Sequence, residues 1–184
     1  MNAETAPKSK RPVFADDVEV STTGEIKMIQ PSHIRADHRN NESRGWAPYE
    51  APEEIKHLLA DGRCCFTLAE IEQRFASLLL EGQICEVEVS LGGDGRPTLT
   101  VGYLRHAAFL LAEVRGVLGQ IPTTARTKVW GVRAKIVPAP KSQEEWDRAS
   151  DRNYAENSER LELTPVQFAF YIKRKLDTLD NNGA

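Results

Sequence analysis

The sequence has few cysteines and no long apolar run. Its three cysteines are Cys64, Cys65 and Cys85; because the count is odd and two are adjacent, a disulfide framework is disfavoured and a reducing compartment is expected. No stretch approaches the ~20 apolar residues that a membrane-spanning helix needs. The N-terminus lacks the apolar segment of a secretory signal. We therefore expect a cytoplasmic protein that has no membrane partner.

The sequence also lacks an excess of positive charge. Its formal net charge is −3 over 184 residues, so it does not coat nucleic acid through bulk charge, and any DNA contact must use a local patch. The four histidines show no metal-ligand spacing, which disfavours a zinc site. With 40 % apolar and 28 % charged residues, the composition is that of a globular protein, and the length suits one domain with a real core.

The hydrophobic pattern predicts an α+β domain, a small mixed sheet with a β-hairpin flanked by helices. We expect a flexible N-terminal tail over 1–24 and one domain over 25–184, without a helix-turn-helix domain. The expected elements are a short strand within 24–34, helices at 52–60 and 67–82, strands at 84–91 and 96–101 around a turn at 92–95, a helix at 103–116, a strand at 127–137, a partly helical stretch at 142–157, and a final helix at 164–176.

Local signals set the bounds of several of these elements. Thr67 followed by Glu70 has the spacing of a capping box, and Gly82 suits the end of that helix. Alternation over 84–91 predicts a half-buried strand. In the long loop over 35–54, Trp46 and Tyr49 either stack a nucleotide base or pin the loop to the core.

A glycine separates a predicted strand from a predicted helix at Gly102. Such a junction directs backbone N–H groups and the positive helix end outward, which suits a phosphate group. Arg105 lies one turn into the helix, where it can pair with an oxyanion, and His106, next to it, is a further candidate contact for a nucleotide. The alternative is a tight turn with an exposed arginine.

A second polar cluster comes before the final predicted helix. Glu156 and Arg160 are i, i+4 neighbours, and Asn157 lies beside Glu156. In a functional interpretation, Arg160 meets phosphate oxygens, while Glu156 and Asn157 supply oxygen ligands to a magnesium ion held with phosphates. In the alternative interpretation, they form a solvated ion pair.

Two stretches together resemble the N-terminal core of ParB partition proteins. "EGQICEVEVSLGGDGRPTLTVGYLRHAAFLLAEV", 81–114, is similar to the helix, strand, hairpin and Gly-Glu-Arg-Arg-x-Arg-Ala box of that family. "AENSERLELTPVQFAFY", 155–171, resembles its second box, Glu-Asn-x-x-Arg-x-Asp-Leu-x-Pro. Upstream, "IKMIQPSHIRADHRNN" resembles the opening strand and loop. The resemblance covers roughly 26–176.

This resemblance implies a ParB/sulfiredoxin-type fold that binds a nucleoside triphosphate, CTP or ATP, with magnesium. The first box would hold phosphates, and the second would add metal and phosphate contacts. The matching positions are Gly102, Arg105 and Ala108 in the first box, and Glu156, Asn157, Arg160, Leu163 and Pro165 in the second, with Glu162 where Asp is usual.

The sequence departs from the family in the first box. Tyr103, Leu104 and Ala107 replace a glutamate and two arginines, so two phosphate-binding charges are missing. If each charged hydrogen bond contributes about 1.5–3 kcal/mol, affinity falls ~10²–10⁴-fold without compensation. The candidates for compensation are Arg115, Arg126 and Lys128.

Three functions follow from these features. The first is a nucleotide-binding protein in plasmid or mobile-element maintenance, acting as a homodimer or beside a separate DNA-reading partner. The second is a magnesium-dependent, ATP-hydrolysing DNase resembling plasmid oncogenic-suppression proteins, in which a metal held by Glu156 activates water and the basic loops 35–44 and 126–135 contact DNA. The third is a degenerate protein-interaction module.

Overall fold

The computed structural model describes residues 24–38, 47–92, 94–123, 129–139, 141–142, 145, 169, 172–173 and 176. Among these residues, no helix is long and apolar enough to cross a membrane. The predicted partly helical stretch at 142–157 and the final helix lie almost entirely outside the described residues. Ala169, Ile172, Lys173 and Leu176 are helical and exposed.

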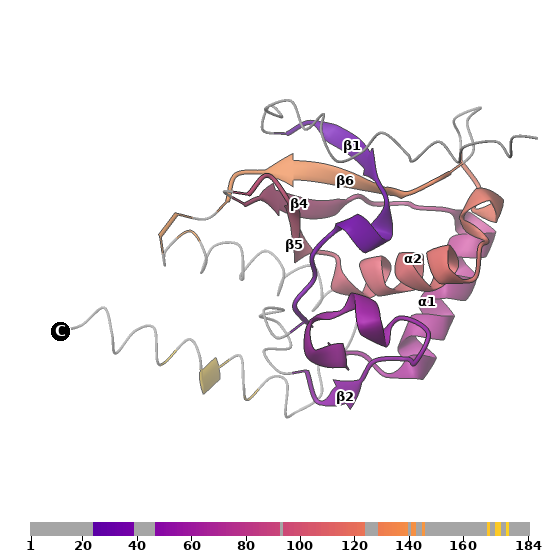
Figure 1. Ribbon diagram of the computed structural model, residues 1–184, viewed down its shortest axis with the longest axis horizontal. Coiled ribbons are helices and arrows are strands. Elements are labelled where there is room, and N and C mark those ends of the chain that lie inside the picture. Colours follow the sequence, from indigo (N-terminus) through magenta and orange to yellow (C-terminus); the bar gives the residue numbers. More distant parts are fainter. Residues whose placement is uncertain are drawn as a thin grey trace, which may run out of the picture.

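A four-stranded mixed sheet forms one layer of the fold (Figure 1), with strand order β1-β6-β4-β5. Strand β6 runs parallel to β4 and antiparallel to β1, and β5 is the antiparallel hairpin partner of β4. The strands are β1 (Ile26–Ile29), β4 (Val87–Leu91), β5 (Pro97–Val101) and β6 (Val132–Val137). The predicted α+β class, with a hairpin in a mixed sheet, is confirmed.

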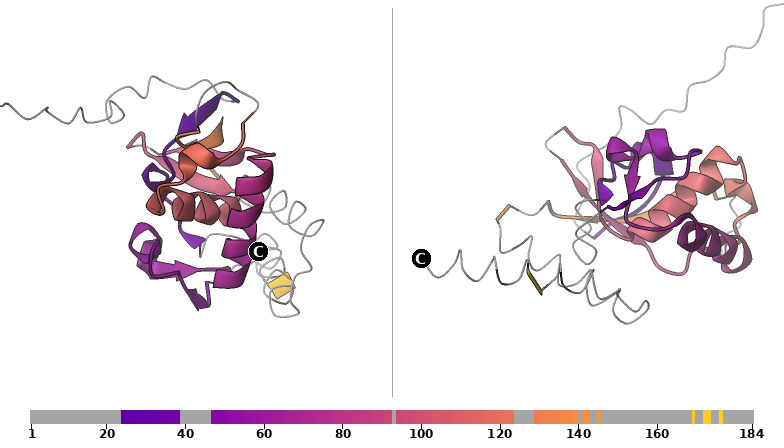
Figure 2. Two further views of the ribbon diagram at one scale, coloured as in Figure 1. Left: turned by 90° about the vertical axis from the view of Figure 1, so that its right-hand side faces the viewer. Right: turned by 90° about the horizontal axis from the view of Figure 1, so that it is seen from below.

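Helix α2 (Tyr103–Val114) packs against this sheet, and α1 (Leu68–Glu81) packs against α2 (Figures 1 and 2). Helix α2 lies between the sheet and a small ribbon formed by β2 (Tyr49–Glu50) and β3 (Arg63–Cys64), so it is covered on most sides. Every residue from 105 to 112 is buried. A helix that is buried all round needs mostly apolar residues all round, which "AAFLLA" at 107–112 supplies.

The capping box at the start of α1 is present as predicted. The Thr67 hydroxyl accepts a hydrogen bond from the Glu70 N–H, and the Glu70 carboxylate accepts one from the Thr67 N–H at 2.7 Å. At the other end, Gly82 has φ 76° and ψ −168°, a combination that is essentially restricted to glycine. These local signals therefore fix both ends of α1.

The predicted helix over 52–60 is wrong. The chain forms two short 3-10 turns there, Lys56–Leu58 and Ala60–Gly62, separated by an extended Leu59. Tertiary hydrogen bonds pull the segment out of helical geometry, since the Ala51 N–H donates to the Gly62 carbonyl at 2.9 Å. Starting a helix is unfavourable, and a helix of only two turns adds few hydrogen bonds to offset that cost. The tertiary hydrogen bonds therefore outweigh the helix propensity of the segment.

A carboxylate ties the loop after β1 to α2. Glu113 accepts hydrogen bonds from the N–H and hydroxyl of Ser32 at 2.8 and 2.7 Å, and from the side-chain amide of Gln30. Ser32 lies in the 3-10 turn Pro31–His33, which packs on α2. The contact fixes the N-terminal segment over the helix whose first turn carries the candidate site.

Candidate functional site

Gly102 forms the junction between β5 and α2, as the sequence predicts. Its φ of 95° and ψ of 34° place it in the left-handed region, where glycine is favoured. A Cβ atom there would lie 2.9 Å from Val87 Cγ1 and 3.2 Å from Arg105 Nη1. No side chain caps the helix at this residue. The junction thus brings the backbone and the Arg105 guanidinium close together at the positive end of α2.

Arg105 is 9 % exposed and folds back under this junction. Its Nη1 donates to the Glu86 carbonyl oxygen at 2.6 Å. The arginine lines a cavity of about 280 Å³ with residues from α1 and from the segment that follows it: Arg74, Ser77, Leu78, Gly82, Ile84 and Cys85. We call this space the arginine cavity. Its described lining includes the guanidinium groups of Arg74 and Arg105, a type of group that can pair with an anion such as phosphate.

Arg74 is a site residue that sequence reasoning missed. It lies on α1 with Ser77 and Leu78, and this i, i+3, i+4 spacing places the three residues on one helix face. That spacing is visible in the sequence, but nothing local shows that this face meets the first turn of α2. The pairing of α1 with α2 is what brings Arg74 to the same cavity as Arg105.

His106 was predicted beside Arg105 as a nucleotide contact, and the structure places it inside the core. It is fully buried, and its Nε2 donates to the Pro31 carbonyl at 2.9 Å. Burial lowers the pKa of His106 to about 4, against the opposing effects of the Pro31 hydrogen bond and the Glu113 charge. His106 is therefore neutral at pH 7 and is not among the residues that line the arginine cavity.

The residues that replace the charged positions of the family pattern serve packing. Tyr103 is 3 % exposed, donates from its hydroxyl to the Leu99 carbonyl at 3.1 Å, and meets the His38 ring edge-on with centroids 5.2 Å apart. Ala107 is fully buried. Charged side chains at 103 and 107 would enter the core, whereas Leu104 is partly buried and packs against the core.

Arg115 does not compensate for the missing charges. It lies at the far end of α2, about 20 Å along the helix from Gly102 at 1.5 Å per residue. There it forms hydrogen-bonded ion pairs with Glu54 and Glu72, at 2.9 and 2.6 Å, and its guanidinium lies 5.1 Å from the centre of the Phe75 ring. Arg115 was one of three candidates for compensation, and it is not among the residues that line the arginine cavity. Arg126 and Lys128 lie outside the described residues.

The second box is not described by the structure. Glu156, Asn157 and Arg160 lie outside the described residues, so their roles in nucleotide and metal binding stay predictions. Within the described part of the chain, no group of three His, Cys, Asp or Glu side chains is placed to hold a metal ion.

The two basic loops proposed for DNA contact are only partly described. Arg35 pairs with Asp94 at 3.3 Å, and its backbone bonds to β5. Arg133 and Lys135 lie on β6 and pair with Glu86 and Glu88 at 3.4 and 3.8 Å. These three cations are partly neutralised by carboxylates. Of the two loop aromatics, Tyr49 lies in β2 with 41 % exposure, and Trp46 is outside the described residues.

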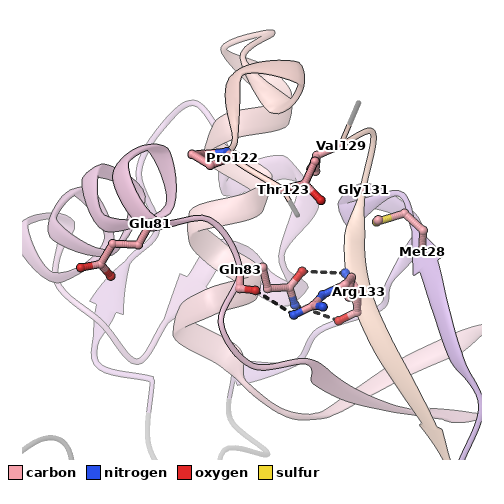
Figure 3. Close-up of a pocket in the computed structure, with 8 residues that line it drawn as sticks. All are labelled: Met28, Glu81, Gln83, Pro122, Thr123, Val129, Gly131 and Arg133. Atoms are coloured by element: carbon pink, nitrogen blue, oxygen red, sulfur yellow. Dashed lines mark hydrogen bonds between the residues drawn. The ribbon is translucent and has the colours of Figure 1, made fainter. Parts of the chain in front are cut away.

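A second cavity of about 230 Å³ adjoins the first strand of the sheet (Figure 3). Its described lining comes from β1, the end of α1 and the segment after it, residues 122–123, and β6 with the residues just before it: Met28, Glu81, Gln83, Pro122, Thr123, Val129, Gly131 and Arg133. Gln83 and Arg133 lie side by side in this lining and are joined by hydrogen bonds (Figure 3).

Comparison with known proteins gives a structural likeness alone. No family model matches the sequence, and no curated protein matches it. The chain is similar in structure to the C-terminally truncated chromosome-partitioning protein ParB from Caulobacter crescentus, solved in complex with CTP-gamma-S, with a TM-score of 0.42 and 13 % identity. The match covers 85 % of this chain and 66 % of that chain, which is just under two thirds.

Proposed function

We propose that the chain binds a nucleoside triphosphate, CTP or ATP, with its phosphates in the arginine cavity. The observation that carries the proposal is the buried Arg105 at the first turn of α2, beside a cavity that Arg74 also lines. A helix N-terminus without a side-chain cap and two guanidinium groups are complementary to phosphate oxygens. The resemblance of the sequence to ParB proteins supplies the class of ligand.

From the same sequence resemblance, we infer that this binding serves the maintenance of plasmid or mobile-element DNA. The function would be that of a switch, in which occupancy of the cavity changes a contact with a second copy or with a DNA-reading partner. Arg160 would add a phosphate contact, and Glu156 and Asn157 would hold magnesium. Within the described residues, nothing favours the nuclease alternative, since its catalytic group, Glu156, lies outside them.

Removing the Arg105 guanidinium is expected to weaken nucleotide binding. Arg105→Gln loses charged hydrogen bonds to phosphate, each of which contributes about 1.5–3 kcal/mol, so the dissociation constant should rise ~10- to 100-fold. Isothermal titration calorimetry with CTP, ATP, GTP and UTP, each with magnesium, measures the change.

Arg63→Gln is the matched control, because it removes the same charge from an exposed residue on β3 that does not line the arginine cavity. Its affinity should equal that of the wild type. The proposal fails if the wild type gives no heat with any of the four nucleotides, or if Arg105→Gln binds as tightly as Arg63→Gln.

A further inference from the structure

One short segment separates the two cavities. Residues 82–86 connect α1 to β4 without regular secondary structure. Gly82, Ile84 and Cys85 line the arginine cavity, whereas Gln83 lines the second cavity. The position of this connecting segment therefore sets the shape of the wall opposite Arg105.

The Gln83 side chain holds the connecting segment onto the sheet. Its Nε2 donates to the Arg133 carbonyl at 2.9 Å and to the Cys85 carbonyl at 3.0 Å, and its Oε1 accepts from the Arg133 N–H at 2.7 Å. Figure 3 shows the amide facing the β6 backbone. Since the β4–β6 ladder begins with Val87 opposite Ala134, the side-chain amide acts as one more rung before the strands pair.

Arg133 secures the same segment from the other direction. Its Nη2 donates to the Gln83 carbonyl at 2.7 Å and to the Ile84 carbonyl at 3.4 Å. The guanidinium also lies 3.4 Å from the Glu86 carboxylate. Together these contacts fix the backbone of three consecutive residues, 83 to 85, against the start of β6.

The next residue along the chain anchors Arg105. The Glu86 carbonyl accepts the Arg105 Nη1 hydrogen bond at 2.6 Å. A shift of the connecting segment would move this carbonyl, and with it the guanidinium that lines the cavity. The wall of the arginine cavity and the position of the Arg105 guanidinium thus both depend on how the Gln83 side chain positions the connecting segment.

We propose that Gln83 is a positioning residue for the anion-binding cavity, acting through residues 84–86 on Arg105 without touching the ligand. This inference rests on the proposed function. It assigns no separate ligand to the second cavity, because the polar groups of Gln83 and Arg133 there are already bonded to each other.

The test is a double-mutant cycle measured by CTP and ATP titration. Gln83→Met keeps the length and charge of the side chain but removes all three amide hydrogen bonds, and it should weaken binding ~10-fold. In the Arg105→Gln background the same change should weaken binding less than 2-fold, because the group that Gln83 positions is gone. Equal effects in both backgrounds would overturn the inference.

Two further variants separate positioning from general destabilisation. Thr67→Ala removes the capping box at the far end of α1, lowers stability by about 1 kcal/mol, and should leave affinity unchanged. If it weakens binding as much as Gln83→Met, positioning is refuted. Arg133→Met keeps the backbone N–H and carbonyl that bond the Gln83 side chain but removes the guanidinium hydrogen bonds. It should weaken nucleotide binding ~3-fold. It replaces Gln83→Met in the test if that variant does not fold.

The outcomes for the two proposals differ. If the wild type does not bind nucleotide, the proposed function fails. If the wild type binds and Arg105→Gln does not, but Gln83→Met and Arg133→Met both bind like the wild type, the positioning role alone is wrong.

Discussion

Lowering the pH from 7.5 to 5.0 is expected to remove about 4 kcal/mol of folding stability through two buried histidines. Burial lowers the pKa of His38 to about 3, an effect that the nearby His106 increases and Asp37 opposes, and burial lowers the pKa of His106 to about 4. In the unfolded chain both titrate near 6.5.

The sign follows from proton counting. Below pH 6.5 the unfolded chain takes up a proton at each histidine, whereas the folded protein does not until the pH falls close to 4 or 3. The unfolded state thus binds more protons. For each histidine, the folding stability therefore decreases by about 1.4 kcal/mol for every unit by which the pH is lowered. Over roughly 1.5 units below 6.5, each histidine accounts for about 2 kcal/mol.

Urea unfolding at several pH values between 7.5 and 5.0 measures this loss. His106→Gln keeps a donor for the Pro31 carbonyl and cannot ionise, so it should lower the pH dependence by about half. His57→Gln, at an exposed position, should leave the dependence unchanged. If His106→Gln shows the full wild-type dependence, the fall arises from other groups and the account of the buried histidines is wrong.

Replacing Gly82 by alanine is expected to cost about 3 kcal/mol or more. The backbone there, with φ 76° and ψ −168°, imposes strain of about 1–3 kcal/mol on any residue with a Cβ. The new Cβ would also lie 2.3 Å from the Pro122 carbonyl oxygen. Because a backbone atom of another segment must move, the clash adds to the strain.

Gly95→Ala is the matched control for this change. Gly95 also has a positive φ, 71°, but a Cβ there meets nothing within 4 Å. Gly95→Ala should therefore lower the folding stability by about 1 kcal/mol, from backbone strain alone and without a steric clash. Urea unfolding of both variants gives the difference. Equal losses in the two would contradict the close approach of the connecting segment to Pro122.

The parts of the fold that sequence predicts best are those with a local chemical signal. The Thr67–Glu70 capping box and Gly82 give the bounds of α1 to within a residue or two, and alternation identifies β4, in which Val87 and Val89 are fully buried. Residues 52–60 carry a helical pattern but no strong cap, and tertiary hydrogen bonds decide their conformation.

The candidate site shows the same division. Gly102 is evident from sequence because only a glycine suits that backbone geometry. The role of Arg74 depends on which face of α1 meets α2, and the role of Gln83 depends on where β6 begins. Both are features of the tertiary structure that the local sequence does not reveal. His106 was placed in the site because it neighbours Arg105, but adjacent helical residues point about 100° apart, and its side chain enters the core.

The most direct test of the central claim is an NMR titration of the ¹⁵N-labelled protein with CTP and ATP, each with magnesium. The account predicts chemical-shift changes that concentrate at the backbone amides of 82–86 and 102–105 and at the side-chain Nε–H groups of Arg74 and Arg105. The amides around Arg115, at the other end of α2, should stay unchanged. Saturable binding with no change at 102–105 would contradict the claim that phosphate occupies the first turn of α2.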